Sequence, residues 1–300
     1  MDKHEAKTKL ANIMEKFIGL ACKRLPDDVY AKLKELRERE ESEIQKVIYD
    51  TYFDNLDKAL KLNRPACQDT GLLHFYINCG SEFKYIGIVE AALREAVANA
   101  TVSAPLRQNA VNYFEERNTE DNTGERMPWI HWEIVPDSDA LEICLYFAGA
   151  GCCLPGRAQV FKPSDGYAAI IKYVFDAVSD LGLNACPPFV VGIGLGHNVE
   201  NAAVLSKMAY LRPLGTTHAH PKGAKLERDL LEGLNSLGIG AQGLPGKQVA
   251  MEVHVESSAR HTATIAVGVS VSCYMHRRGF IKFNNDLEFD FSKSYKGVSI

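Results

Sequence analysis

Residues 164–196 read SDGYAAIIKYVFDAVSDLGLNACPPFVVGIGLG, and this stretch decides the fold class. Its first half has the apolar spacing of a helix, with Ser164 as a good N-cap and Gly182 as the residue that should end it. The stripe consists of Tyr167, Ile170, Ile171, Val174, Phe175, Val178 and Leu181. A tight connection with two prolines then leads into an apolar strand at Phe189–Ile193. A helix followed at once by a buried strand predicts an α/β protein.

The same alternation extends on both sides of this stretch. Further strands are expected at 72–78, 131–135, 141–147, 249–255 and 262–271. Further helices are expected at 88–100, 199–210 and 226–237, the last closed by Gly238. We find no internal repeat and no long linker, so residues 1–300 are expected to form one domain.

Residues 1–62 predict helices only, separated near Pro26 and ending before Pro65. The first apolar stripe consists of Leu10, Ile13, Met14, Phe17, Ile18 and Ala21, and the last of Ile44, Val47, Ile48, Tyr52, Leu56, Ala59 and Leu60. We expect this helical N-terminal region to pack on the α/β region, residues 63–300, and to cover its core.

Composition and charge exclude several classes of protein. The 34 basic and 38 acidic residues are interspersed and give a net charge of −4, which argues against a dedicated nucleic-acid binder. No apolar run approaches the ~20 residues that span a bilayer. The charged start of the chain lacks the apolar core of a secretory signal, so a cytoplasmic location is expected.

Eight cysteines in such a protein need an explanation other than disulfides. No CxxC pair is present, which weakens zinc-ribbon and thioredoxin interpretations. Most of these thiols are therefore expected to be inert and buried. Three of them, Cys67, Cys186 and Cys273, stand in loops or at a strand end beside polar residues or prolines. Each position taken alone is more typical of a structural cysteine.

Taken together, the three cysteines suggest an iron–sulfur cluster, because thiolates are its usual ligands. Four thiolates saturate the irons of a cubane, whereas three leave one iron open. An open iron is a Lewis acid that can bind a hydroxyl and a carboxylate of a substrate. Sequence spacing alone does not prove such a site, since the ligands would meet only in the fold.

Several motifs resemble the class I, iron–sulfur fumarase and tartrate dehydratase family over nearly the whole chain. The motifs that carry chemistry are Ala66–Gly71, Ala185–Pro188, and His261 with Cys273 twelve residues later; the others are Leu62–Pro65, Ala104–Arg107, Leu154–Arg157 and His276–Gly279. The intervals of 119 residues from Cys67 to Cys186 and 87 from Cys186 to Cys273 also match. The resemblance implies the α/β fold of that family's cluster-binding, N-terminal domain.

The resemblance also implies site residues. The ligands of a [4Fe-4S] cluster with one iron open to substrate would be Cys67, Cys186 and Cys273. The substrate-binding residues would be Gln68, Arg107, Gly149 and Gly151, the last two flanking Ala150 where the family has a glycine triplet. The catalytic residues would be Asp69, as base or as a residue that orients one, and His261. Cys152 and Cys153 are interpreted as structural.

The implied activity is that of a hydro-lyase. The expected reaction is dehydration of L-tartrate to oxaloacetate and water, and the alternative is hydration of fumarate to malate. Single-chain members carry a further C-terminal domain, whereas two-subunit members have a separate beta subunit. We therefore expect this chain to be inactive alone and to form an α2β2 heterotetramer with a beta subunit.

Three other interpretations stay open at this point. A zinc site would use His218 and His220 with His254 or cysteines, without the spacing of a strong zinc motif. A nucleotide site would use the glycines of 192–196, although His197 stands where a sixth-position glycine is needed. A non-enzymatic scaffold would use the N-terminal helices as an interaction surface.

Overall fold

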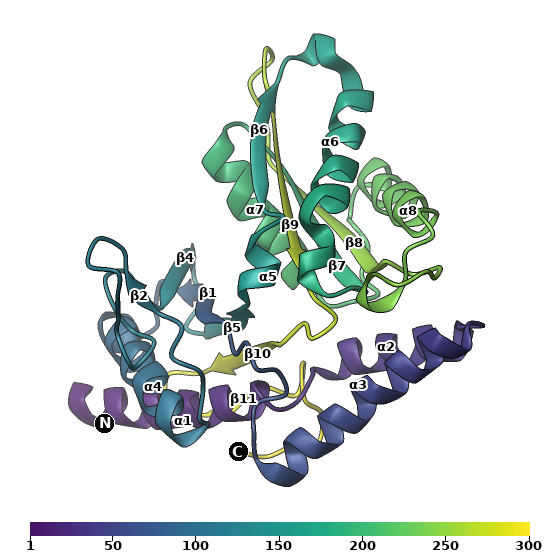
Figure 1. Ribbon diagram of the computed structural model, residues 1–300. Coiled ribbons are helices and arrows are strands. Elements are labelled where there is room, and N and C mark those ends of the chain that lie inside the picture. Colours follow the sequence, from purple (N-terminus) through teal and green to yellow (C-terminus); the bar gives the residue numbers. More distant parts are fainter. The chain divides into compact units, whose positions relative to one another are not determined.

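The computed structural model describes all 300 residues, which divide into two compact units. Unit one consists of residues 1–27, 54–149 and 277–300. Unit two consists of residues 28–53 and 150–276. The long helix α3 (Glu43–Leu62) contributes residues to both. The predicted α/β class is confirmed, because each unit combines a sheet with covering helices (Figure 1).

Unit one contains a five-stranded sheet in the order β11-β10-β5-β1-β4. The strands are β1 (Leu72–Gly80), β4 (Trp129–Val135), β5 (Leu141–Ala148), β10 (Arg278–Phe283) and β11 (Phe289–Asp290). Strand β1 lies between β4, with which it pairs in parallel, and β5, with which it pairs antiparallel, so the two strands flanking the predicted turn at Pro136 do not pair with each other. A small separate hairpin joins β2 (Val111–Asn112) to β3 (Arg117–Asn118).

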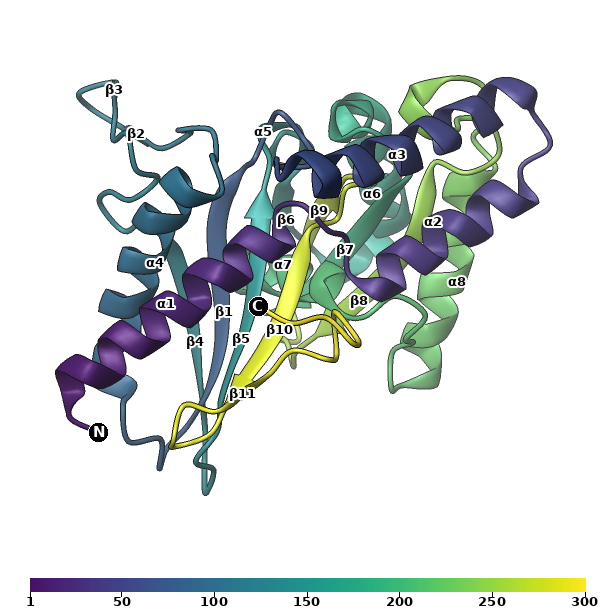
Figure 2. The same cartoon turned by 90° about the horizontal axis from the view of Figure 1, so that it is seen from below.

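Helices α1 (Lys3–Ala21) and α4 (Val89–Ser103), the latter preceded by the 3-10 turn η1 (Ile86–Ile88), cover one face of this sheet (Figure 2). Asp2 caps α1, since its carboxylate accepts the amide hydrogens of His4 and Glu5. The predicted stripe of α1 is confirmed, with all of its residues buried except the half-buried Ile13. These side chains pack on the inward residues of β1, which are Leu73, Phe75, Ile77 and Cys79.

Unit two contains a four-stranded sheet in the order β6-β9-β7-β8. The strands are β6 (Arg157–Phe161), β7 (Phe189–Gly196), β8 (Ala250–Ser257) and β9 (Ile265–Ser272). The helices are α2 (Asp27–Arg39), α5 (Ala150–Cys153), α6 (Gly166–Leu181), α7 (Val199–Leu211) and α8 (Pro221–Asn235), with 3-10 turns η2 (Pro163–Asp165), η3 (Gly182–Ala185) and η4 (Ala241–Gly243). Helices α6 and α8 cover one face and α7 the other (Figure 1).

The two faces of β7 explain its glycines. Val191 and Ile193 point to the core beneath α6 and α8, and the alternating residues Gly192 and Gly194 face α7. A Cβ at either glycine would lie 2.0 Å from a main-chain oxygen of α7. The glycines therefore allow the backbone of α7 to lie directly on the sheet. Because they belong to the strand itself, they do not form the phosphate-binding loop that a nucleotide site needs.

The helix predicted after Ser164 is confirmed as α6, and Gly182 ends it as predicted, but the predicted N-cap is wrong. Ser164 lies in η2, and the N-cap is Asp165, whose carboxylate accepts the amide hydrogen of Lys162 instead of capping α6. Gly182 has a right-handed φ of −59° and continues into η3. The left-handed residue comes four positions later, at Cys186, with φ of +53°.

Other elements also differ from the prediction. In α3 the buried face is rotated: Ile44, Val47 and Leu60 are exposed, and the buried residues are Gln45, Tyr49, Tyr52, Leu56 and Ala59. Gln45 is buried because it accepts the Ala241 amide hydrogen at 2.8 Å and donates to the Pro245 carbonyl at 3.1 Å.

Strand β9 starts at Ile265 instead of Thr262, because Arg260 donates to carbonyls of the preceding loop. Helix α8 ends at Asn235, before Leu237 and Gly238, and strands β6 and β10 were not anticipated.

Candidate active site

The loop Cys67–Gly71 leads into β1 of unit one. Cys67 is half-buried and Gln68 is exposed. The carboxylate of Asp69 accepts the Gly71 amide hydrogen at 2.9 Å and an amide hydrogen of the Asn109 side chain at 3.3 Å, both on Oδ1. Gly71 has φ of +74° and would place a Cβ 2.8 Å from the main chain of Ala148, so no other residue fits there. Asp69 is therefore held in one orientation by a fixed turn.

The segment that carries Arg107 is attached to the same loop. The Arg107 amide donates to the hydroxyl of the buried Thr70 at 2.9 Å, and its carbonyl accepts from the buried Asn122 side chain at 3.0 Å. The guanidinium of Arg107 is exposed. Unit one thus holds Asp69 and the backbone of Arg107 in fixed positions on two connected segments. The contribution of Asn109 and Asn122 could not be recognised from sequence, because nothing in their immediate neighbours distinguishes them from ordinary loop residues.

Arg277, in the motif His276–Gly279, also contacts this loop. His276, Arg277 and Arg278 are all buried. Arg277 Nη2 donates to the main-chain oxygen of Asp69 at 2.7 Å, and its guanidinium carbon lies 5.3 Å from the centre of the Phe147 ring. Its Nε and Nη1 have no hydrogen-bond partner. Burying a cation costs free energy. Because Arg277 is buried and bonds the main chain of Asp69, we infer that it helps to hold this loop in place.

Unit two brings Cys186 and Cys273 to one end of its sheet. Cys186 is exposed and lies three residues before the start of β7, whereas the half-buried Cys273 immediately follows β9. Because β7 and β9 are antiparallel, the start of one lies beside the end of the other. The Tyr274 amide donates to the Cys186 carbonyl at 3.2 Å. The two predicted ligands therefore stand on adjoining loops.

Cys152 lies in the same neighbourhood. It is buried in α5, and its sulfur accepts the Cys273 amide hydrogen at 3.3 Å. Gly151, just before it, comes so close to η3 that a Cβ would lie 2.2 Å from the Asn184 oxygen. Gly149 ends the segment 54–149 of unit one, and the exposed Ala150 begins α5 in unit two. The prediction that Cys152 is structural agrees with its burial, while its contact with Cys273 was not foreseen.

His261 is placed apart from Cys186 and Cys273. It is exposed in the loop before β9, and its Nδ1 accepts the Ala263 amide hydrogen at 3.1 Å. Strand β9 separates it from Cys273. Eight strand residues at about 3.3 Å each cover about 26 Å, so the two residues lie at opposite ends of the strand. Its predicted catalytic role stays a prediction.

The thiols divide clearly by environment. All eight cysteines are free, and Cys22, Cys79, Cys144 and Cys152 are buried. Burial raises the pKa of the Cys22 thiol to about 11 and that of Cys144 to about 12, and it also raises the pKa of Cys79. Cys67, Cys186 and Cys273 are all at least partly exposed. Sulfur donors that solvent can reach on fixed loops fit the requirements of iron–sulfur ligation.

Comparison with known proteins identifies the family. The family model described as fumarate hydratase (Fumerase) matches residues 11–282. The chain is 52% identical over 289 residues to proteins named L(+)-tartrate dehydratase subunit alpha from Escherichia coli strains UTI89 and K12, covering 96% of this chain and 95% of each relative. A putative L(+)-tartrate dehydratase subunit alpha from Methanocaldococcus jannaschii is 34% identical over 93% of this chain and 99% of the relative.

The chain belongs to the fumarate hydratase family. The matched region contains every predicted ligand, substrate-binding and catalytic residue, and the predicted hydro-lyase class is confirmed at the level of the family. None of the helices is both long enough and apolar enough to cross a membrane.

The zinc interpretation finds no support in this fumarate hydratase family member. In the turn of residues 212–220, Nδ1 of His218 and of His220 accept amide hydrogens from His220 and Lys222, respectively. Within unit two, His218, His220 and His254 belong to no group of three or more His, Cys, Asp or Glu side chains that could hold a metal ion.

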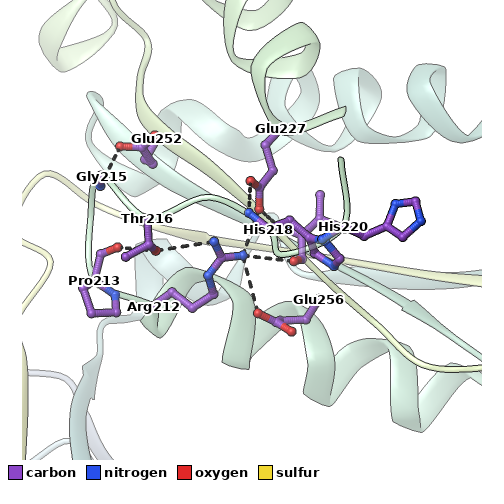
Figure 3. A network of polar contacts seen from close by, with 10 residues as sticks. Arg212, Pro213, Gly215, Thr216, His218, His220, Glu227, Glu252 and Glu256 are labelled. Carbon is purple, nitrogen blue, oxygen red and sulfur yellow. Dashed lines mark hydrogen bonds and ion pairs between the residues drawn. The ribbon is translucent and has the colours of Figure 1, made fainter. Parts of the chain in front are cut away.

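An ion pair explains why that turn is ordered (Figure 3). The buried Glu227 accepts from Arg212 at 2.9 Å and from the amide groups of Val255 and His218. Arg212 also approaches Glu256 at 3.4 Å. The network fastens the turn to β8 and α8, which is a structural role.

Proposed function

We propose that this chain is the alpha subunit of an L(+)-tartrate dehydratase, which converts L-tartrate to oxaloacetate and water together with a separate beta subunit. The observation that carries the proposal is 52% identity, over 96% of the chain, to proteins of that name. Dehydration of a hydroxy diacid needs a group that accepts the leaving hydroxide, a base that removes a proton from the carbon next to the C–OH carbon, and cationic contacts for two carboxylates.

The proposed cofactor is a [4Fe-4S] cluster whose ligands are Cys67, Cys186 and Cys273. When bound, such a cluster supplies an open Lewis-acidic iron that polarises the C–OH bond of the substrate. Support comes from the donor set, three accessible thiols on ordered loops, and from the contact between the Cys186 and Cys273 loops. The other cysteines, apart from Cys153, are buried and hence less suited to ligation.

The remaining roles fall to the chain's own polar groups. Asp69 would take the proton from the adjacent carbon or orient the base, and its two N–H donors would keep its carboxylate in place. The exposed guanidinium of Arg107 would bind a substrate carboxylate in bidentate fashion. Gln68 would add amide contacts, and the backbone at Gly149 and Gly151 would approach the substrate closely.

His261 was also predicted to be catalytic, either as an acid or as a contact of a carboxylate. Its position at the far end of β9 argues against contact with a substrate held beside Cys186 and Cys273 of the same unit. The variant His261→Asn measures its role: a fall in kcat of tenfold or more with the cluster intact would place it in the reaction. An unchanged kcat would remove it from the site.

Hydration of fumarate to malate is the second candidate, because the matching family model is that of fumarate hydratase. The relatives named for tartrate favour the first reaction. The test is an anaerobic assay of this chain, co-produced with its beta subunit, on L-tartrate and L-malate in parallel. A much higher kcat/KM on L-tartrate supports the proposal, and the opposite preference makes the protein a fumarase. Asp69→Asn with a full complement of iron is the inactive control.

The α2β2 assembly and the cytoplasmic location expected from the sequence belong to the same proposal. The word "subunit" in the names of the relatives supports a partner chain. Sedimentation of the co-produced protein tests the stoichiometry, and cell fractionation tests the location.

A further inference from the structure

One buried tyrosine in unit two touches both cysteine-bearing loops. Tyr52, on α3, is 5% exposed. Its ring stacks on that of Tyr274, with centroids 3.7 Å apart and planes inclined by 12°. Its hydroxyl donates to the Pro187 carbonyl at 3.2 Å. Tyr274 follows Cys273 and Pro187 follows Cys186, so a single side chain contacts the residue next to each predicted ligand.

Gln242 completes the arrangement. Its side-chain amide donates to the Tyr52 hydroxyl at 2.7 Å, and its own main-chain amide donates to the Pro187 carbonyl at 2.9 Å. Gln242 has φ of +56°, a conformation that L residues rarely adopt. The Tyr52 hydroxyl thus both donates and accepts a hydrogen bond. Burial raises the pKa of Tyr52 well above its ordinary value of 10.0, so its hydroxyl keeps the proton it donates.

The neighbouring tyrosine of the same helix lacks these contacts. Tyr49 is fully buried and packs edge-on against Tyr52, with ring centroids 5.9 Å apart. Its hydroxyl has no hydrogen-bond partner. Packing alone therefore explains Tyr49, whereas Tyr52 has a polar connection to the loop of Cys186 and a stacking contact with the loop of Cys273.

We propose that Tyr52 is a positioning residue that fixes the Cys186 loop against the Cys273 loop, so that both thiols are held ready for the cluster. The claim about the two loops stands on the contacts above, and only its purpose rests on the proposed function. The hydroxyl is the part that matters, because the Tyr52 ring can stack on Tyr274 without it.

The first experiment uses the protein without its cluster and measures amide hydrogen exchange in Tyr52→Phe, with Tyr49→Phe as the matched control. Removing the Tyr52 hydroxyl takes a donor from the Pro187 carbonyl and an acceptor from Gln242. We expect exchange in peptides covering 240–246 and 272–276 to accelerate about tenfold, the size of effect of one lost buried hydrogen bond. Peptides from β8 should be unchanged, and Tyr49→Phe should stay within twofold of the wild type throughout.

The second experiment measures how long the cluster is retained after anaerobic reconstitution. We expect Tyr52→Phe to lose iron to a chelator at least fivefold faster than the wild type or Tyr49→Phe, with a similar melting temperature. Equal exchange and equal cluster retention in the two variants would overturn the proposal. A general rise in exchange over the whole of unit two would also overturn it, because the role of Tyr52 would then be one of core packing.

The two experiments separate this inference from the proposed function. If the wild type binds no cluster, the proposed cofactor is wrong, but the exchange measurement still decides whether Tyr52 joins the two loops. If the cluster binds and tartrate does not react, the retention measurement is still valid.

Discussion

Asp69 is held from two sides, by N–H donors on its carboxylate and by the buried guanidinium of Arg277 on its carbonyl. Replacing Arg277 with Met keeps the shape of the side chain and removes the charge and the hydrogen bond. We expect kcat to fall tenfold or more, since the loop loses its support, while the melting temperature changes little because an incompletely paired buried charge is also removed. Steady-state kinetics and thermal unfolding of the chain co-produced with the proposed beta subunit measure both. A kcat within twofold of the wild type would show that Arg277 does not support Asp69.

Thiol reactivity should follow burial and pKa. At pH 8 a maleimide should label the exposed Cys186 and Cys153 of the cluster-free chain within minutes. Cys22 and Cys144, with pKa raised to about 11 and about 12, should react at least a hundredfold more slowly until urea unfolds the chain. Peptide mass spectrometry distinguishes the sites. Rapid labelling of Cys144 in the folded chain would contradict the structure.

Glu252 is expected to make stability depend on pH. Burial raises its pKa above the ordinary value of 4.5, with Lys32 and the Gly215 amide opposing the shift. The folded state thus binds the proton more tightly than the unfolded state, and stability is lost as pH rises from the unfolded pKa through the folded one. Glu252→Gln should therefore be more stable than the wild type at pH 7, and the difference should disappear near pH 4. Melting temperatures at the two pH values test this, and an equal difference at both would contradict it.

The sequence alone indicated the residues proposed to carry the chemistry, but not the residues that hold those side chains in position. Cys67, Cys186 and Asp69 stand in motifs with prolines or glycines, which made them visible. Asn109 and Arg277 act through contacts with residues 40 and 208 positions away in the chain. Such contacts are set by the pairing of β1, β5 and β10, which no local pattern specifies.

At the scale of elements, the approach of α7 to β7 depends on glycine. Gly194→Ala would place a Cβ 2.0 Å from the Ala202 oxygen, so the helix must shift. We expect a loss of about 3 kcal/mol of unfolding free energy, in the range of overpacked cores. Gly87→Ala, where no atom lies within 4 Å, is the matched control and should change stability little. Urea unfolding of both variants is the measurement, and similar midpoints would contradict the packing described.

Periodicity predicted most helices and strands here because their buried faces are regular. It failed in α3, where the polar side chain of Gln45 is buried because it hydrogen-bonds to main-chain groups. It also failed before β9, where Arg260 hydrogen-bonds to loop carbonyls that would otherwise be free to pair in the strand. The spacing of His261 and Cys273 is a further example. Twelve residues look close in sequence, but an extended strand between them separates the two side chains.

At the scale of the whole molecule, the expected subunit organisation leads to a direct prediction. The chain produced alone and reconstituted with iron and sulfide should show less than about one hundredth of the turnover of the two-subunit enzyme, since the proposed site lacks its beta contribution. Adding the beta subunit should restore activity in proportion to complex formed, followed by sedimentation and assay. Full activity of the isolated chain would show that it contains the complete site.

Cys186 occupies a backbone conformation that suits glycine, with φ of +53°. A residue with a side chain costs about 1 kcal/mol there. A library selected only for heat resistance should therefore enrich Cys186→Gly, whereas Cys273→Gly, whose backbone has no such strain, should be depleted. Selection for growth on the substrate should reverse the preference at position 186. Selection for stability and selection for activity would then favour different residues at position 186. Engineering this protein for stability should therefore leave Cys186 unchanged.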